Sequence, residues 1–468
     1  MNITDTLSKI NQWWTTNEVP GSFLYPATRK ELSGIVSLLR EDRVTAIIGP
    51  RRTGKSILLY QIVQHLLSDH IENKRILFFS GDDPALFFSS VSISDILDSY
   101  CLDILHEPLE KLTKTIYILI DEVHTIENWQ QWIKKYYDQK LNIKFIISGS
   151  SSTHLFHGSR ESLLGRIDYI PILPFDFSQF CYFWSIYQQS QNLSDFFLLL
   201  PSFSFLDSPI EYFQYLQSNN WRFSTFTPLL HKVLKEYLLV GGYPEYFSNK
   251  DIFMWQKRLS TDIVNQGLYR DVVYAYQIKN PERLEQLLYF IAANNGQDFN
   301  FKTIADTLHC DNETVSKYLT YLEQAYLISI QHHFSRNIGK GIRKNKKLYI
   351  HDNGLANALL HYNEIDSIRE GFLIENSCVQ FVQNYANTHG WGIGYYRGEN
   401  SEIDIIVDKH SRVLPIEVKF RNHLPLTSSF SVFSSHNKSI PVEKPIVITK
   451  NQLKETNQYI AIPFYLIR

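Results

Sequence analysis

Between residues 30 and 180, short apolar runs alternate with segments of helical pattern. In chain order the runs are VTAIIG, RILFFSGDD, YILIDE and KFIISGS, and the amphipathic segment KSILLYQIVQHLL follows the first of them. Continuous apolar runs separated by helices are typical of a parallel sheet that is covered on both faces. The pattern therefore predicts an α/β domain with a parallel sheet in this part of the chain.

Residues 186–230 depart from this alternation, because serine, asparagine and aromatic residues dominate and no strand pattern remains. We interpret this stretch as a helical insertion and assign no chemistry to it. The helical pattern resumes from residue 231 to about residue 278. We expect this second segment to form a lid on the α/β domain.

Three helical patterns and two strand patterns follow Pro281. Apolar residues recur at helical spacing in the first helix, a short helix is expected at 303–308, and Asp311 and Asn312 cap a third. The strands LISIQHHF and KLYIHD come next, joined by a turn that contains glycine. This order predicts a winged helix-turn-helix. The final stretch, 372–468, predicts a helix followed by strands.

Residues 49–56, GPRRTGKS, form a complete phosphate-binding loop of the pattern GxxxxGK[ST]. The loop lies between an apolar run and a helix, which is the context that its chemistry needs. Its backbone N–H groups can wrap around phosphates, Lys55 can reach the outer phosphates, and Ser56 can offer its hydroxyl to Mg²⁺. We therefore predict that the chain binds ATP and Mg²⁺. The residues expected at the nucleotide are Gly49, Pro50, Arg51, Arg52, Thr53, Gly54, Lys55 and Ser56.

Two further strand ends predict hydrolysis of the nucleotide. The strand TIYILIDE ends in Asp121 and Glu122, where Asp121 can hold Mg²⁺ through water and Glu122 can orient the attacking water as a base. The next strand ends in a run of serines. Ser148 is expected to lie between Glu122 and the outer phosphate and to sense that phosphate; the alternative is an ordinary serine-rich turn.

The segment SRESLLGR places Arg160 and Arg166 after the last of these strands. An arginine supplied to a site can stabilise charge on the transferring phosphoryl group, and Arg166 is the stronger candidate. Action on a neighbouring subunit would require a ring or a dimer, whereas action within its own subunit would not. The alternative is that both arginines pair with surface carboxylates.

Length and composition set the broad class. With 468 residues, the chain is expected to hold about two to four domains. A hydrophobic content of 44% and a charged content of 20% are typical of a soluble globular protein. The four cysteines show no zinc-binding spacing, and neither a leader nor a membrane-spanning run is found, so we expect a cytoplasmic protein without membrane contact. A net charge of −2 means that any nucleic-acid partner must meet a local basic patch.

Five segments occur in order: GPRRTGKS, IDEVHTIENWQQWIKKYYD, IISGSSS, ESLLGRIDYIPILPFDFSQF and EYLLVGGYPEYF. Together they resemble the stand-alone prokaryotic AAA+ ATPases that are often labelled archaeal-type ATPases, from about residue 28 to the C-terminal end. The resemblance implies a P-loop AAA+ domain over 1–185 and a helical insertion and lid over 186–278. It also implies a winged helix-turn-helix over 279–352 and a restriction-endonuclease-like α/β domain over 353–468.

The stretch GENSEIDIIVDKHSRVLPIEVKF carries Asp404 on one strand and Glu417 and Lys419 on the next. Side chains repeat every two residues along a strand, so Glu417 and Lys419 share a face. Asp404 and Glu417 can then bind Mg²⁺ or Mn²⁺, and Lys419 can position the attacking water or stabilise developing charge. The stretch resembles the PD-(D/E)xK nuclease core, especially the archaeal Holliday junction resolvases, in which Glu375 fits the acidic helix position. Arg397 could hold a phosphate or a surface carboxylate.

The segment RNIGKGIRKNKK contains six basic residues and no acidic one. On the wing of a winged helix it could neutralise DNA phosphates, whereas the alternative is a solvated loop. Lys317 on the third helix could approach a groove, but winged helices also bind proteins. The residues of the predicted nucleic-acid face are Arg336, Lys340, Arg343, Lys344, Lys346, Lys347 and Lys317.

Two hypotheses from different classes follow. In the first, ATP binding and hydrolysis control a C-terminal metal-dependent nuclease that acts on DNA, and by analogy such an enzyme would suit defence or the processing of mobile elements. In the second, the chain is a nucleotide-dependent switch whose winged helix and nuclease-like domain bind DNA or a partner protein without cutting.

Overall fold

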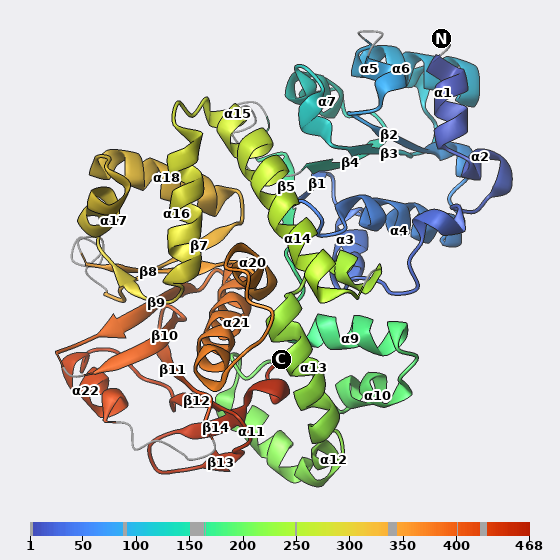
Figure 1. Ribbon diagram of the computed structural model, residues 1–468. Helices are drawn as coiled ribbons and strands as arrows, with labels where there is room; N and C mark the ends of the chain where they lie inside the picture. Colours follow the sequence, from blue (N-terminus) through green and yellow to red (C-terminus); the bar gives the residue numbers. More distant parts are fainter. Residues whose placement is uncertain are drawn as a thin grey trace. The chain divides into compact units, whose positions relative to one another are not determined.

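The computed structural model (Figure 1) divides into two compact units. Unit 1 comprises Met1–Leu173 with Gln266–Gln277, and unit 2 comprises Pro174–Asn265 with Ile278–Arg468. The structure describes residues 3–87, 91–149, 163, 165–248, 250–335, 344–399, 401–421 and 428–468. Among the helices of these residues, none has the length and apolar character that a membrane span requires.

Unit 1 is built on a five-stranded parallel sheet with the strand order β2-β3-β4-β1-β5. Its strands are β1 (Val44–Ile48), β2 (Ile76–Ser80), β3 (Ile116–Asp121), β4 (Ile143–Gly149) and β5 (Ile167–Pro171). The central strands are almost wholly buried, as the continuous apolar runs predicted, because helices lie on both sides of the sheet (Figure 1). The predicted parallel α/β domain is confirmed.

The N-terminal helices of unit 1 cover the edge of this sheet. The Asn11 side chain donates to the Phe78 carbonyl (2.9 Å) and accepts from the Phe78 N–H (2.7 Å), while the indoles of Trp13 and Trp14 donate to the Ile76 carbonyl. These side chains satisfy backbone groups of β2 that an open edge would leave unpaired. The helices of unit 1 are α1 (Ile3–Ile10), α2 (Trp13–Thr16), α3 (Glu31–Leu38), α4 (Lys55–Ser68), α5 (Pro84–Phe87), α6 (Ile93–Ser99), α7 (Trp129–Asp138) and α15 (Tyr274–Tyr276).

Unit 2 begins with a group of helices that includes the expected insertion. They are α9 (Phe177–Tyr187), α10 (Gln191–Leu199), α11 (Pro209–Ser218), α12 (Asn220–Ser224), α13 (Thr227–Val240) and α14 (Ile252–Asp262). The insertion packs on the C-terminal end of the chain, because the buried Tyr212 hydroxyl donates to the Leu466 carbonyl (2.5 Å). Tyr385 likewise donates to Asp207 (2.7 Å). Hydrogen bonds therefore join the insertion to the C-terminal part of unit 2.

Three helices and a small antiparallel sheet follow in unit 2. They are α16 (Pro281–Ala293), β6 (Asp298–Phe299), α17 (Phe301–Leu308), α18 (Asn312–Gln324), β7 (Ile328–His332) and β8 (Lys346–Ile350), with the strand order β6-β8-β7. Asn300 caps α17 by accepting from the Thr303 N–H, and Asp311 caps α18 by accepting from the Thr314 N–H. The elements follow the order expected of a winged helix-turn-helix, and that interpretation stays a prediction.

The C-terminal part of unit 2 is a six-stranded mixed sheet. Its elements are α20 (Asn353–Leu359), α21 (Ser367–Thr388), β9 (Gly392–Arg397), β10 (Glu402–Asp408), β11 (Val413–Lys419), α22 (Ser429–His436), β12 (Ile446–Thr449), β13 (Lys454–Glu455) and β14 (Ile460–Pro463). The strand order is β13-β14-β12-β11-β10-β9; β9, β10 and β11 are antiparallel, and β12 runs parallel to β11. Helix α21 packs against β9, β10 and β11.

The two sheets of unit 2 meet along β7 and β9. The Phe334 N–H donates to the Tyr395 carbonyl (2.6 Å), and His333 forms a parallel bridge with Tyr395. The buried Gln331 side chain donates to the carbonyls of Gly394 (3.2 Å) and Asp404 (3.1 Å). The three helices α16, α17 and α18 with their small sheet are called the three-helix element below. A backbone hydrogen bond and two side-chain hydrogen bonds of Gln331 therefore join this element to the C-terminal sheet.

A glycine pair holds α13 close to α20. Gly241 has φ 78°, and a Cβ placed there would lie 2.1 Å from Asp352 Oδ1. The buried Asp352 carboxylate cannot yield easily, because it accepts from the N–H groups of Gly242 (2.7 Å) and Leu355 (2.9 Å). This geometry is the physical reason for glycine at position 241.

Gly241→Ala is expected to destabilise the chain by at least about 2 kcal/mol, because it combines a left-handed φ with a clash in a buried junction. Gly371→Ala is the matched control: Gly371 lies within α21 with nothing within 4 Å of its added Cβ, and alanine there should be neutral or stabilising. Thermal unfolding of both variants measures the difference. Equal unfolding temperatures would contradict this account of the junction.

Candidate functional sites

The phosphate loop of unit 1 joins β1 to α4. Gly49 must be glycine, because its φ is 149° and a Cβ would lie 2.1 Å from the Ile172 carbonyl oxygen. Gly54 adopts the left-handed conformation at the start of α4. The buried Lys55 ammonium donates to the carbonyls of Gly49 (3.0 Å) and Pro50 (2.9 Å). Burial lowers the pKa of Lys55, and the carboxylates of Glu122 and Asp121 oppose that shift.

Asp121, Glu122 and Ser148 converge beside this loop. Because the strands are parallel, their carboxyl ends meet at one sheet edge, and β4 lies between β1 and β3. The Ser148 hydroxyl donates to Asp121 Oδ1, and the Glu122 N–H lies 3.1 Å from the same oxygen and 3.4 Å from Ser148 Oγ. Burial raises the pKa of Glu122, while Lys55 opposes the shift. Ser148 therefore contacts the acidic pair, and its predicted place beside the outer phosphate stays a prediction.

Arg51 in the loop has a partner that sequence reasoning missed. Its guanidinium contacts both oxygens of the buried Asp271 carboxylate, with Nε and one terminal nitrogen each at 2.8 Å. Asp271 lies in the π-helical segment Ile263–Val273, which sequence analysis assigned to the lid, and both residues belong to unit 1. A bidentate pair of this kind is a strong charge-assisted contact. The feature of the sequence that could have indicated this partner is the single carboxylate in the stretch LYRDVV, which is otherwise mostly apolar.

Arg166 lies far from the phosphate loop of its own subunit. Its carbonyl accepts from the N–H of Val44, the first residue of β1, whereas the loop follows the last residue of β1. Five strand residues span roughly 16 Å, so the Arg166 backbone lies at the opposite end of β1 from the loop. The guanidinium pairs with Asp138 (2.9 Å), and action on a neighbouring subunit stays a prediction. Arg160 lies outside the described residues.

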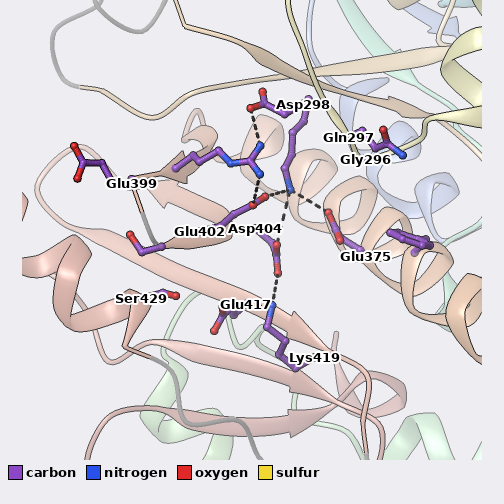
Figure 2. Close-up of a pocket in the computed structure, with 15 residues that line it drawn as sticks. Gly296, Gln297, Asp298, Glu375, Glu399, Glu402, Asp404, Glu417, Lys419 and Ser429 are labelled. Atoms are coloured by element: carbon purple, nitrogen blue, oxygen red, sulfur yellow. Dashed lines mark hydrogen bonds and ion pairs between the residues drawn. The ribbon is translucent and has the colours of Figure 1, made fainter.

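The C-terminal sheet carries a second candidate site, a pocket of about 750 Å³ (Figure 2). Six carboxylates and three basic side chains line it. They are Asp298, Glu375, Glu399, Glu402, Asp404, Glu417, Lys347, Arg397 and Lys419. The excess of carboxylates favours a cation over an anion in this pocket.

Asp404, Glu417 and Lys419 meet in this pocket. The Lys419 ammonium lies 3.4 Å from Glu417 Oε1 and 3.8 Å from Asp404 Oδ2 (Figure 2). Asp404 Oδ2 also accepts from the Val418 N–H (2.8 Å). Burial raises the pKa of Glu417, and Lys419 opposes the shift. Within the described part of the chain, the buried Glu417 Oε2 has no hydrogen-bond partner.

Lys347 requires a correction, because it is not a surface residue of a basic wing. Its side chain is only 5% exposed, and its ammonium lies 2.7 Å from Glu402 Oε1, 3.3 Å from Glu375 Oε1 and 3.9 Å from Asp404 Oδ1. The Tyr349 hydroxyl, two residues along β8, also donates to Glu375 (2.8 Å). Sequence reasoning missed Glu402, although alternation along β10 places it on the face of Asp404.

The other predicted basic residues differ in their surroundings. Lys344 is exposed, Lys346 is half-buried with its ammonium 4.3 Å from the Phe301 ring centroid, and Lys317 pairs with Glu313 (2.7 Å). Arg336, Lys340 and Arg343 lie outside the described residues. Arg397 contacts the carboxylates of Asp298 (2.7 Å) and Glu402 (3.3 Å). Of its two predicted partners, a phosphate or a carboxylate, the structure contains the carboxylate. The predicted nucleic-acid face stays a prediction apart from Lys347.

The donor set at Asp404 and Glu417 fits one divalent cation. Among the described residues, no cluster of three histidine, cysteine or acidic side chains has metal-binding geometry, and Glu375 is held by Lys347 and Tyr349. Mg²⁺, however, is commonly bound through one or two carboxylates with water and substrate phosphates. The unpartnered Glu417 Oε2 is an oxygen available for such an ion.

Comparison with known families bears on the first site. Residues 41–181 match a family model described as an AAA domain, which spans the phosphate loop, the acidic pair and Ser148. This part of the chain is therefore similar to AAA domains. Residues 231–366 and 370–467 match two models that are each described as a domain of unknown function (DUF8612 and DUF4143).

Several proteins resemble much of the chain. An uncharacterized protein of Haemophilus influenzae is 25% identical over 83% of this chain and 85% of its own. An uncharacterized protein of Methanocaldococcus jannaschii is 24% identical over 89% of this chain and 83% of its own. Among solved structures, a Walker-type ATPase of Pyrococcus abyssi aligns over 71% of this chain and 95% of its own, with 17% identity and a TM-score of 0.40. The Aeropyrum pernix ORC2 protein aligns over 78% and 96%, with 11% identity and a TM-score of 0.38.

Proposed function

We propose that this chain is an ATP hydrolase that acts on DNA, and that its nucleotide state controls metal-dependent cleavage of a phosphodiester in the C-terminal pocket. The observation that carries the proposal is the convergence of Asp404, Glu417 and Lys419 in a pocket of the same chain that holds an AAA+ domain. The experiment that tests it compares DNA cleavage by the parent chain and by Glu417→Ala, with ATP hydrolysis measured in the same preparations.

In the first site, the backbone of the phosphate loop would surround the phosphates, and Lys55 would turn from the loop carbonyls to the outer phosphates. Asp121 and Ser56 would hold Mg²⁺, which when bound neutralises charge on those phosphates. Glu122 would accept a proton from the attacking water, and burial raises the pKa of this base, which favours proton uptake. Ser148 bonds the neighbouring Asp121 and would sense the outer phosphate.

In the second site, Asp404 and Glu417 would hold Mg²⁺ or Mn²⁺. A bound cation would polarise the phosphodiester and lower the pKa of a water. Lys419 is close enough to both carboxylates to position that water or to stabilise the developing charge. Because carboxylates outnumber basic residues in the pocket, a phosphodiester would be repelled until a cation is bound. This charge balance supports metal dependence.

A second function is favoured by one observation. Lys347 already pairs with Glu375 and Glu402, which partly neutralises the pocket without any metal ion. A non-cleaving switch would use such a pocket to bind DNA or a partner protein under nucleotide control. A parent chain that binds DNA differently with ATP and ADP, yet leaves it intact with Mg²⁺ or Mn²⁺, would favour the switch.

Lys55→Ala is expected to weaken ATP binding by roughly ten- to a hundredfold, because it removes a charged hydrogen bond worth about 1.5–3 kcal/mol. Binding of a fluorescent ATP analogue measures the change. Lys111→Ala is the control, since Lys111 is an exposed lysine of unit 1 outside the loop. Unchanged affinity in Lys55→Ala would contradict the assignment of the loop.

A further inference from the structure

A lysine from the three-helix element reaches into the C-terminal pocket. Lys347 lies on β8, whereas Glu375 lies on α21 and both Glu402 and Asp404 lie on β10. Its ammonium contacts the carboxylates of these three residues, which are labelled in Figure 2. Burial disfavours the charged form, but the three carboxylates outweigh burial and raise the pKa of Lys347. The pocket therefore contains a buried lysine whose ammonium is paired with carboxylates of two other elements.

Asp404 lies between this cation and a second one. Its Oδ1 faces the Lys347 ammonium at 3.9 Å, and its Oδ2 faces the Lys419 ammonium at 3.8 Å. In sites with two divalent ions, the ions lie about 3.5–4 Å apart, and a shared carboxylate can contact both. Glu375 and Glu402 add oxygens on the Lys347 side, whereas Glu417 with its unpartnered Oε2 adds oxygens on the other. The carboxylates thus form two groups that share Asp404.

We infer that the Lys347 ammonium takes the place of a second divalent cation, so that the pocket binds a single ion, held by Asp404 and Glu417. The inference rests on the metal site of the proposed function. Glu375 and Glu402 then neutralise Lys347, and the metal ion is bound by Asp404 and Glu417. Because Lys347 belongs to β8, the three-helix element supplies part of the pocket's charge.

The test is the number of Mn²⁺ ions bound per chain, measured by isothermal titration without nucleotide. All proteins are full chains that carry Asp121→Asn, which removes a carboxylate of the first site. The otherwise unaltered chain should bind one ion, and Lys347→Met should bind two. Lys344→Met, which removes an exposed lysine two residues before β8, should still bind one.

Two further variants test whether the charge of Lys347 and the carboxylate of Glu375 determine the number of bound ions. Lys347→Arg keeps a cation in place and should bind one ion. Glu375→Gln combined with Lys347→Met should lose the second ion and keep the first. Circular dichroism and thermal unfolding establish that each variant is folded.

The inference is overturned if the unaltered chain binds no ion or two, or if folded Lys347→Met still binds one. The proposed nuclease activity fails separately. If Lys347→Met gains a second ion but the parent chain never cuts DNA, the inference about Lys347 is supported and the proposed nuclease activity is contradicted. If the unaltered chain cuts DNA with two bound ions, the nuclease activity is supported and the inference is contradicted.

Discussion

Glu122→Gln should bind ATP at parental affinity and hydrolyse it about 10²–10⁴-fold more slowly, because the amide cannot accept a proton from the attacking water. The substitution keeps the size of the side chain and leaves the Glu122 backbone N–H facing Asp121 and Ser148 at the carboxyl end of β3. Phosphate release under single-turnover conditions measures the rate, and a fluorescent ATP analogue measures binding.

Glu127→Gln is the matched control for this experiment. Glu127 is an exposed carboxylate five residues farther along the chain, and its substitution should leave hydrolysis unchanged. Parental hydrolysis by Glu122→Gln would contradict the assignment of the base. Lost ATP binding in that variant would instead point to a structural role for the carboxylate.

Glu417→Ala is expected to abolish DNA cleavage and to leave ATP hydrolysis intact. The substitution removes one of the two carboxylates proposed to hold the cation, including the unpartnered Oε2, and it leaves Lys419 without its nearest carboxylate. Removing the ion removes the activated water, so the loss should be at least about a thousandfold. Cleavage of linear, supercoiled and branched DNA with Mg²⁺ or Mn²⁺ measures it.

Glu455→Ala serves as the control, because Glu455 is an exposed residue on β13 of the same sheet whose ion pair with Lys444 is at the surface. It should cut DNA as the parent does. Cleavage by Glu417→Ala at the parental rate would assign any observed nuclease activity to another site or to a contaminant.

The sequence predicted those parts of the sites that local pattern determines. Apolar runs between helices predicted a parallel sheet, and parallel strands bring their carboxyl ends to one edge. For this reason the sequence alone predicted one site that contains the phosphate loop, Asp121, Glu122 and Ser148. Period-two alternation likewise placed Glu417 and Lys419 on one face of β11.

The sequence did not predict contacts made between distant segments. Asp271 lies 220 residues from Arg51, and no local pattern links a helical carboxylate to the phosphate loop. Lys347 ends a run of basic residues that predicted a solvent-exposed wing. In the structure it lies on β8 beside α21 and β10, and its side chain is buried against their carboxylates. The contact of the Asn11 side chain with the edge of β2 was also not predicted, because these two segments are distant in sequence and meet only in the folded chain.

Nucleotide control of DNA cleavage is tested by the rate at which the parent chain cuts DNA with ATP, with ADP and without nucleotide, in the presence of Mg²⁺ or Mn²⁺. We expect cleavage of at least one of linear, supercoiled and branched DNA, at a rate that changes with the bound nucleotide, if the chain is a nucleotide-controlled nuclease. Intact DNA of all three kinds under every nucleotide condition would contradict it.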